Sequence, residues 1–219
     1  MKHEPALAIE HLGVTYDRTV IEDFSLIVER GQSVALMGPS GSGKSSILAC
    51  AVGMQRPTRG SVAVDGNDLS RARPSRRARL RRELMGVAYQ DAGLLPELSV
   101  AENVAVTLLF DGVPRSKALS MASDSLAAVG LTDHVDKPVD QISGGQAQRV
   151  SIARALVRPS AVLLVADEPT TSLDQDTAAD IISLLGERVH DTGVGALIAT
   201  HDPAVAAACD TVIDLRDHR

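Results

Sequence analysis

Aromatic side chains are scarce in this chain of 219 residues, which has no tryptophan, two tyrosines and two phenylalanines. Its core must therefore be packed from Leu, Val, Ile and Ala, within an ordinary apolar content of 44%. Proteins that bind single strands of nucleic acid combine basic grooves with aromatic stacking platforms. A net charge of −6 and so few aromatic rings argue against a nucleic-acid partner.

Cysteines and long apolar runs are also few. Cys50 and Cys209 lie far apart and fit no metal-ligand spacing, so we expect two small buried hydrophobic residues in a reducing compartment. An apolar run such as Val104 to Phe110 is well short of the about 20 residues that span a membrane. The first residues lack the apolar core of a signal peptide. We predict one domain, residues 1–219, that folds in the cytoplasm.

One glycine-rich stretch has a highly specific spacing: Gly38-Pro39-Ser40-Gly41-Ser42-Gly43-Lys44-Ser45, followed by Ser46. It matches the P-loop, whose glycines let backbone N–H groups curl around phosphates. An apolar stretch precedes it and helix-compatible residues follow, so the phosphates would lie at a helix N-terminus. We predict that Lys44 contacts the terminal phosphates of a nucleotide and that Ser45 binds Mg²⁺.

Two acids follow a predicted central strand, Ala161 to Ala166, that is apolar on both faces. Successive strand residues point to opposite sides, so Asp167 is assigned to Mg²⁺ and Glu168 to the attacking water. Another buried strand, residues 195–200, ends at His201. Because ligands gather at the carboxyl ends of parallel strands, we expect His201 near the γ-phosphate.

A second glycine-rich turn, Ser143-Gly144-Gly145-Gln146, opens a predicted helix and by the same physics can receive an anion. Helical patterns near 99–110 and 115–129 precede it, and residues 91–159 contain no strand signal. Outside this interval, strands are predicted at 6–16, 19–29, 61–64, 85–89 and 211–215, and helices at 175–190 and 203–208. The chain therefore reads as an α/β domain with a helical insertion.

Three features keep two interpretations each. The arginine-rich stretch 71–82 is a solvated helix face or a contact for anionic lipid or a partner subunit. The leucines in Leu94 to Leu98 pack on the core or form a docking surface. Tyr16, taken alone, is more simply a half-buried strand residue than a ring that stacks on a purine.

Taken in order, these motifs resemble those of the nucleotide-binding subunit of an ABC transporter, over nearly the whole chain. Gly38 to Ser45 resembles Walker A, Val162 to Asp167 Walker B, and His201 the switch histidine. Ser143 to Gln146 resembles the signature, with Ile142 in place of the usual leucine before it. Gln90 is similar to the Q-loop glutamine, and Ser172 to Asp174 to the D-loop. The signature separates this family from other P-loop ATPases and from kinases.

The resemblance implies a fold and an assembly. The fold is α/β, a P-loop NTPase (RecA-like) core with a parallel sheet, a small antiparallel β subdomain and an inserted α-helical subdomain. Residues 1–90 and 160–219 would form the P-loop NTPase core and the antiparallel β subdomain. Residues 91–159 would form the α-helical subdomain. Two copies, an expected homodimer, would bind two ATP–Mg²⁺ head to tail, with Ser143 and Gly145 reaching the partner's γ-phosphate.

The resemblance also assigns further roles. Tyr16 would stack on adenine, Asp174 would belong to the ATP site, and Gln90 would contact the metal and, with His201, sense the phosphate. The region Gln90 to Leu98 would dock on integral membrane permease subunits, which places the chain on the cytoplasmic face of the cell membrane.

The branch of the family is indicated by two stretches, Leu94 to Val104 and Ala166 to Thr170, which resemble macrolide exporters and lipoprotein-release complexes. Thr171-Ser172 replaces the Gly-Asn common there, so a cell-division ATPase or an importer subunit stays open. The alternative from a different functional class is a soluble P-loop ATPase or a kinase that is not coupled to a membrane. A kinase would need a lid with phosphate-binding arginines and would not need the signature.

Overall fold

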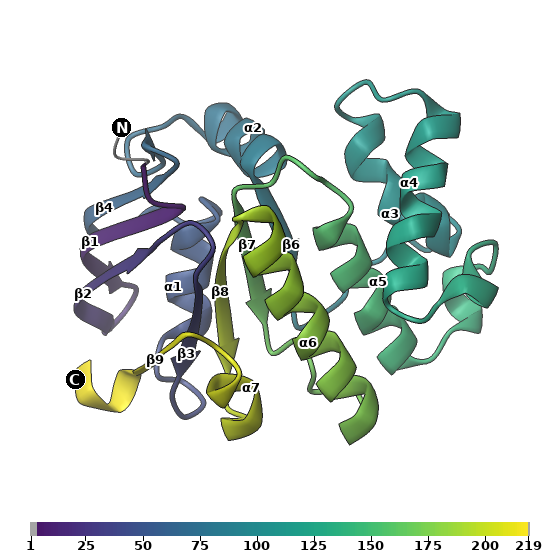
Figure 1. The fold of residues 1–219 in the computed structure, drawn as a ribbon. Coiled ribbons are helices and arrows are strands. Elements are labelled where there is room, and N and C mark those ends of the chain that lie inside the picture. The colour runs from purple at the N-terminus through teal and green to yellow at the C-terminus, as the bar shows by residue number, and fades with distance from the viewer. Residues whose placement is uncertain (1–3, 219) are drawn as a thin grey trace.

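An antiparallel sheet of four strands forms one end of the molecule in the computed structural model, which describes residues 4–218 (Figure 1). The strand order is β2-β1-β4-β5, and the bounds are β1 Leu7–Thr15, β2 Thr19–Val28, β4 Arg59–Val64 and β5 Asn67–Asp68. Alternating residues of β2, among them Phe24 and Leu26, point into the core. The two residues of β5 are too few to give a strand pattern, and the sequence did not predict them.

A parallel sheet of five strands occupies the centre, in the order β6-β7-β8-β3-β9. The bounds are β3 Ser33–Met37, β6 Met85–Ala88, β7 Leu163–Asp167, β8 Gly195–Thr200 and β9 Thr211–Asp214. Because the strands are parallel, their carboxyl ends meet at one edge. Gly38, Glu168 and His201 therefore follow neighbouring strands directly.

Seven α-helices cover this framework within residues 4–218 (Figure 1). They are α1 Lys44–Ala51, α2 Pro74–Leu84, α3 Val100–Leu109, α4 Arg115–Ala128, α5 Gly144–Leu156, α6 Gln175–Thr192 and α7 Pro203–Ala207. Short 3-10 turns are η1 Thr132–His134, η2 Val139–Gln141 and η3 Leu215–His218. Helices α3, α4 and α5 group together at the end opposite the antiparallel sheet, in the interval predicted to be helical.

The central sheet separates two hydrophobic cores. Leu163 and Val165 of β7 pack with α1 and the antiparallel sheet, whereas Leu164 and Ala166 pack with the helical group and α6. This alternation explains why β7 is apolar on both faces. The predicted fold class is confirmed, and the helices and strands predicted from periodicity lie within a few residues of the observed bounds.

The remaining expectations have mixed outcomes. Cys50 is fully buried, and its burial raises the pKa of the thiol to about 11, but Cys209 is only half-buried. The expectation that both are buried is therefore wrong for Cys209, which follows α7 and packs against the core with part of its surface exposed. The arginine-rich stretch includes α2, whose one buried residue is Leu80. Within residues 4–218, no helix is both long and apolar enough to cross a membrane.

Candidate active site

A cleft of about 580 Å³ lies at the carboxyl edge of the parallel sheet. It is lined by the P-loop, Gln90, Asp167, Glu168 and His201. These residues come from separate regions of the sequence, and the order β6-β7-β8-β3 brings the segments after four strands side by side. The structure thus gathers the predicted catalytic and phosphate-binding groups in one place.

The P-loop has the shape of a phosphate cradle. Gly43 has φ +101°, and a Cβ there would lie 2.3 Å from Cδ1 of Ile21, so both the backbone and the available space require glycine. The Nζ of Lys44 donates to the carbonyl of Gly38 at 2.5 Å, and α1 begins at Lys44 itself. Within residues 4–218, the buried Oγ of Ser42 has no hydrogen-bond partner. The loop thus presents a helix N-terminus, an ammonium group and an unsatisfied hydroxyl to one small volume.

Ser45 and Asp167 meet at the base of the cleft, where Oγ of Ser45 donates to Oδ2 of Asp167 at 3.2 Å. Burial raises the pKa of Asp167, and the charge of Glu168 adds to this, while Ser45 and Lys44 oppose it. A hydroxyl and a carboxylate oxygen are ligands that suit Mg²⁺. In the part of the chain that the structure describes, no three His, Cys, Asp or Glu side chains form a metal site. The residues present fit an ion that is shared with substrate phosphates.

Glu168 is held in a strained backbone conformation with φ +49°, which is unusual for a residue other than glycine. Its Oε2 accepts from Nδ1 of His201 at 2.8 Å and from the backbone N–H of His201 at 3.4 Å. The side chain of Glu168 is 12% exposed and that of His201 66%. The neighbouring acids therefore have different partners: Asp167 faces Ser45, and Glu168 faces His201.

Three predicted site elements lie outside this cleft. Tyr16 is 57% exposed, and its hydroxyl donates to Oε1 of Gln55 at 2.5 Å. Asp174 caps α6, and the backbone N–H of Thr177 lowers the pKa of the Asp174 carboxyl. The turn from Ser143 to Gln146 begins α5, apart from the P-loop.

The structure adds residues that the motifs did not reveal. Arg18 and Thr171 line the cleft beside the P-loop. Gly145 packs on the loop before α6, because a Cβ there would lie 2.7 Å from the carbonyl oxygen of Ser172. Arg18 and Thr171 follow Tyr16 and Glu168 closely in the sequence, and proximity to a motif is the one signal that could have indicated them. The contact between Gly145 and Ser172 has no sequence signal.

A P-loop between a strand and a helix, an acid pair at the end of another parallel strand of the same sheet, and a cleft that both line define a P-loop nucleotide-binding protein. Comparison with known proteins narrows this class, because residues 21–171 match the sequence family described as ABC transporter. The chain belongs to the ABC transporter family, in which it is an ATP-binding, ATP-hydrolysing cassette. The resemblance seen in the sequence is confirmed.

Curated relatives agree with this assignment. The lipoprotein-releasing system ATP-binding protein LolD of Bordetella pertussis is 41% identical over 221 residues, which cover 98% of this chain and 95% of that protein. LolD 1 of Rhodospirillum rubrum is 43% identical over 199 residues, with 90% and 87% covered. The macrolide export ATP-binding/permease protein MacB of Salmonella typhi is 41% identical over 198 residues, or 90% of this chain. The chain spans only 30% of the length of that MacB protein.

Solved structures show the same fold. A dimeric bacterial ABC transporter cassette superposes with a TM-score of 0.91 at 30% identity, covering 95% of this chain and 93% of that one. A dimeric structure of the same cassette in a post-hydrolysis state, bound to ADP and Pi, gives a TM-score of 0.89 at 30% identity and the same coverage.

Proposed function

We propose that this chain hydrolyses ATP as half of a head-to-tail homodimer and thereby drives separate integral membrane subunits of the exporter or lipoprotein-release type. The likeness to LolD and MacB supports the type, and the dimeric solved relative supports the assembly. In this arrangement the chain lies on the cytoplasmic face of the cell membrane, held there by its partners.

One observation carries the proposal: the two predicted anion sites of the chain are separate. The cleft contains the P-loop, Gln90 and both acids, and no residue of the signature turn (Ser143 to Gln146) lines it. Ser143 and Gly144 are exposed to solvent instead. A second copy in head-to-tail orientation supplies the missing half of each site, so two ATP molecules lie between two chains.

Each group in the cleft then has a role. Lys44 and the P-loop N–H groups bind the β- and γ-phosphates, Ser45, Asp167 and Gln90 hold Mg²⁺, and that ion neutralises phosphate charge when bound. Glu168 accepts a proton from the attacking water. His201 orients the Glu168 carboxylate through the 2.8 Å hydrogen bond and contacts the γ-phosphate.

Substrate binding is completed by residues that lie outside the cleft of a single chain. Tyr16 stacks on adenine, and its exposed ring supports this role. The signature turn of the partner closes over the γ-phosphate. Asp174, at the start of α6, contributes to the same interface from the loop that packs on Gly145.

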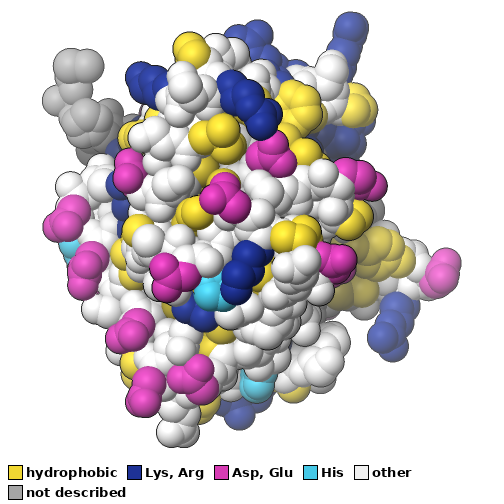
Figure 2. Space-filling view, turned by 90° about the vertical axis from the view of Figure 1, so that its right-hand side faces the viewer, with side chains coloured by type: hydrophobic (Ala, Val, Ile, Leu, Met, Phe, Trp, Pro, Cys, Tyr) yellow, Lys and Arg dark blue, Asp and Glu magenta, His cyan; other side chains and the backbone are white. Residues whose placement is uncertain are grey.

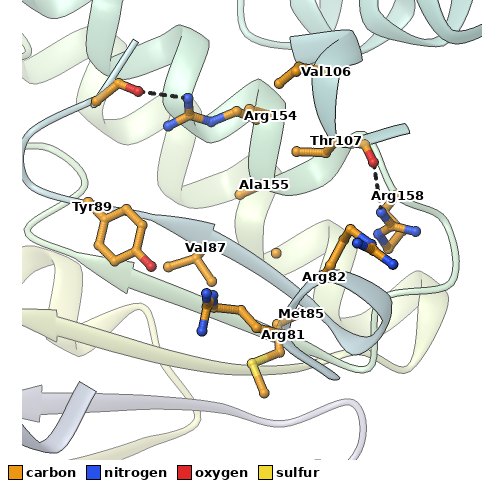
Figure 3. A pocket seen from close by; sticks show the side chains of 12 residues that line it. Arg81, Arg82, Met85, Val87, Tyr89, Val106, Thr107, Arg154, Ala155 and Arg158 are labelled. Atoms are coloured by element: carbon orange, nitrogen blue, oxygen red, sulfur yellow. Dashed lines mark hydrogen bonds between the residues drawn. The ribbon is translucent and has the colours of Figure 1, made fainter. Parts of the chain in front are cut away.

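A groove beside the active site has the chemistry of a docking surface (Figure 3). Its volume is about 410 Å³, and its lining includes arginines from α2 and α5 as well as apolar side chains: Arg81, Arg82, Arg154, Arg158, Met85, Val87 and Val106. Asp111 pairs with Arg82 and Arg158, which leaves the groove with an excess of positive charge. We assign this groove to a segment of the membrane subunit that has apolar residues and at least one acidic side chain.

The loop between Gln90 and Leu98 borders this groove and is firmly anchored. The buried side chain of Asn103 accepts from the N–H of Leu95 at 2.7 Å and donates to the carbonyls of Leu95 and Leu98. Leu94 packs against the helical core, whereas Leu95 is 45% exposed. Of the two interpretations of these leucines, core packing therefore fits Leu94 and docking fits Leu95.

Helix α5 connects the loop from Gln90 to Leu98, here called the docking loop, to the signature turn. Arg154 donates to the carbonyls of Ala92 at 2.5 Å and Gly93 at 3.1 Å, and Gln148 donates to the carbonyl of Tyr89 at 3.4 Å. Since the signature turn is the N-terminus of this helix, a displacement of the docking loop also displaces the signature turn.

Figure 2 shows the face of the molecule on which α3, α4 and α5 lie. Acidic and basic side chains both occur on this face, so no broad field of one sign covers it.

Complementation between two inactive variants tests the head-to-tail arrangement. Lys44→Ala disables the P-loop, and Gly144→Asp adds a negative charge to the signature turn. Gly144 is exposed, and a Cβ added there would have no other atom within 4 Å. Each variant alone should be inactive. Their mixture should regain ATP hydrolysis, because mixed dimers contain one site with both halves intact. A mixture that stays inactive, while wild-type chains mixed under the same conditions are active, contradicts the shared site.

A further inference from the structure

The signature turn has a neighbour that no motif includes, the imidazole of His134 on η1. Ser143 and Gln146 form a reciprocal capping box at the start of α5. The N–H of Gln146 donates to Oγ of Ser143 at 3.2 Å, and the N–H of Ser143 donates to Oε1 of Gln146 at 2.8 Å. The other end of the same amide, Nε2 of Gln146, lies 2.9 Å from Nε2 of His134.

These contacts determine the protonation of the imidazole. The backbone N–H of Ser143 can only donate, so the amide atom that faces it must be the oxygen of Gln146. The amide nitrogen then faces His134 and can only donate, so Nε2 of His134 must be the acceptor. His134 is therefore neutral and has its proton on Nδ1. That Nδ1 is buried and has no hydrogen-bond partner within residues 4–218.

We infer that neutral His134 is a positioning residue for the signature turn: by accepting from Gln146 it fixes the side-chain amide that caps Ser143. A ring with its proton on Nε2 would present N–H to the NH₂ group of Gln146. If the amide turns to accept from that ring, its NH₂ group faces the N–H of Ser143 instead. In both cases one of the two bonds that hold the turn is lost.

The segment that carries His134 is also tied to the docking loop. The carbonyl of Val135 accepts from the N–H of Ala101, and that of Lys137 accepts from the N–H of Val100, both at 2.9 Å. These are the first residues of α3, which directly follows the docking loop. His134 thus links the start of α3 to the signature turn by hydrogen bonds, beside the connection through α5. The inference rests on the proposed role of the signature turn in binding the partner's ATP.

The charged residues on η1, on residues 135–138 and on α3, α4 and α5 are Asp133, Asp136, Lys137, Glu102, Arg115, Lys117, Asp124, Arg149 and Arg154. Arg149 is held by the carbonyls of Val129 and Gly130, and Glu102 by Arg115. Within residues 4–218, His134 forms no ion pair with any of them.

Two substitutions test the role of His134 as an acceptor. His134→Gln places a non-titrating Oε1 near the position of Nε2, and His134→Leu removes the acceptor. We expect His134→Leu to lower turnover about fivefold at pH 8, the effect of losing one hydrogen bond of about 1 kcal/mol. Binding of ATP to the isolated P-loop site should not change. His134→Gln should match the wild type at pH 8, because its Oε1 restores an acceptor for the amide of Gln146.

Two results would overturn the inference: wild-type turnover by His134→Leu at pH 8, or turnover of His134→Gln as low as that of His134→Leu. ¹⁵N NMR of the ATP-free full chain gives a test that does not depend on catalysis, and it should show the Nδ1–H tautomer of His134 at pH 8. An Nε2–H tautomer overturns the inference even if complementation succeeds. Failed complementation with the Nδ1–H tautomer present overturns the proposed function alone.

Discussion

Tyr89 and Gln90 are neighbours in the chain but line different cavities. Tyr89 lies in the arginine-rich groove, and burial raises the pKa of its hydroxyl, whereas Gln90 lies in the cleft with the P-loop. The peptide that joins them follows β6, and α5 contacts it through Gln148. The partner proposed for the groove and a nucleotide in the cleft would therefore act on the same short segment, which would give each a means to shift the equilibrium of the other.

The exposed leucine of the docking loop offers a test of the groove assignment. Leu95→Asp places a charge beside the proposed partner surface, so the chain should be recovered without its membrane subunits while its ATP binding is retained. The measurement is co-purification from detergent-solubilised membranes. Val212→Asp is the matched control, because Val212 is 47% exposed on β9, away from the groove. Equal co-purification of both variants would remove Leu95 from the interface.

The two signature glycines should respond differently to a methyl group. In Gly145→Ala the new Cβ would lie 2.7 Å from the carbonyl of Ser172, whereas in Gly144→Ala it would meet no atom within 4 Å. We expect Gly145→Ala to lower the free energy of unfolding by about 1–3 kcal/mol, as overpacking does, and to displace the loop before α6. Thermal denaturation of the two variants tests this, and equal melting temperatures contradict it.

The carboxylate of Asp167 should destabilise the ATP-free fold, although Mg²⁺-dependent turnover requires it. Its folded-state pKa lies above its value in the unfolded chain, so the unfolded state loses the proton first as the pH rises. The free energy of unfolding contributed by this group therefore falls with rising pH between the two pKa values. Asp167→Asn should stabilise the ATP-free protein at pH 7 and abolish Mg²⁺-dependent turnover. Melting temperatures at pH 4 and 7 check the sign: a variant less stable than wild type at pH 7 is the contrary result.

Removing the ring that orients Glu168 should act on the chemical step. In His201→Ala the Oε2 atom of Glu168 loses its 2.8 Å partner, so kcat should fall by about 10²-fold or more. The affinity for ATP should change little, because Lys44 and the P-loop are intact. Steady-state kinetics with a nucleotide-binding assay separates the two effects. A variant that loses affinity but keeps its kcat would assign His201 to binding instead.

The sequence predicted the site more completely than it predicted the contacts that hold the site together. Asp167, Glu168 and His201 follow apolar strands, and the rule that parallel strands end at one edge was sufficient to bring them together. The pairing of His134 with Gln146 could not be predicted, because it joins a 3-10 turn to a helix cap and no periodicity records it. The anchoring of the loop at Leu95 and Leu98 likewise depends on the side chain of Asn103, whose contacts with the backbone leave no periodic signal.

The most direct test of the shared active site is the association state of Glu168→Gln with ATP. This substitution keeps the P-loop, the contact between Ser45 and Asp167, and the signature turn, but removes the group that accepts the water proton. Size-exclusion chromatography with light scattering should show a monomer without nucleotide and a stable dimer with ATP and Mg²⁺, containing two unhydrolysed ATP molecules. Wild-type protein should return to a monomer as ATP is consumed. A Glu168→Gln chain that binds ATP and stays monomeric, or that hydrolyses it at the wild-type rate, would contradict the account.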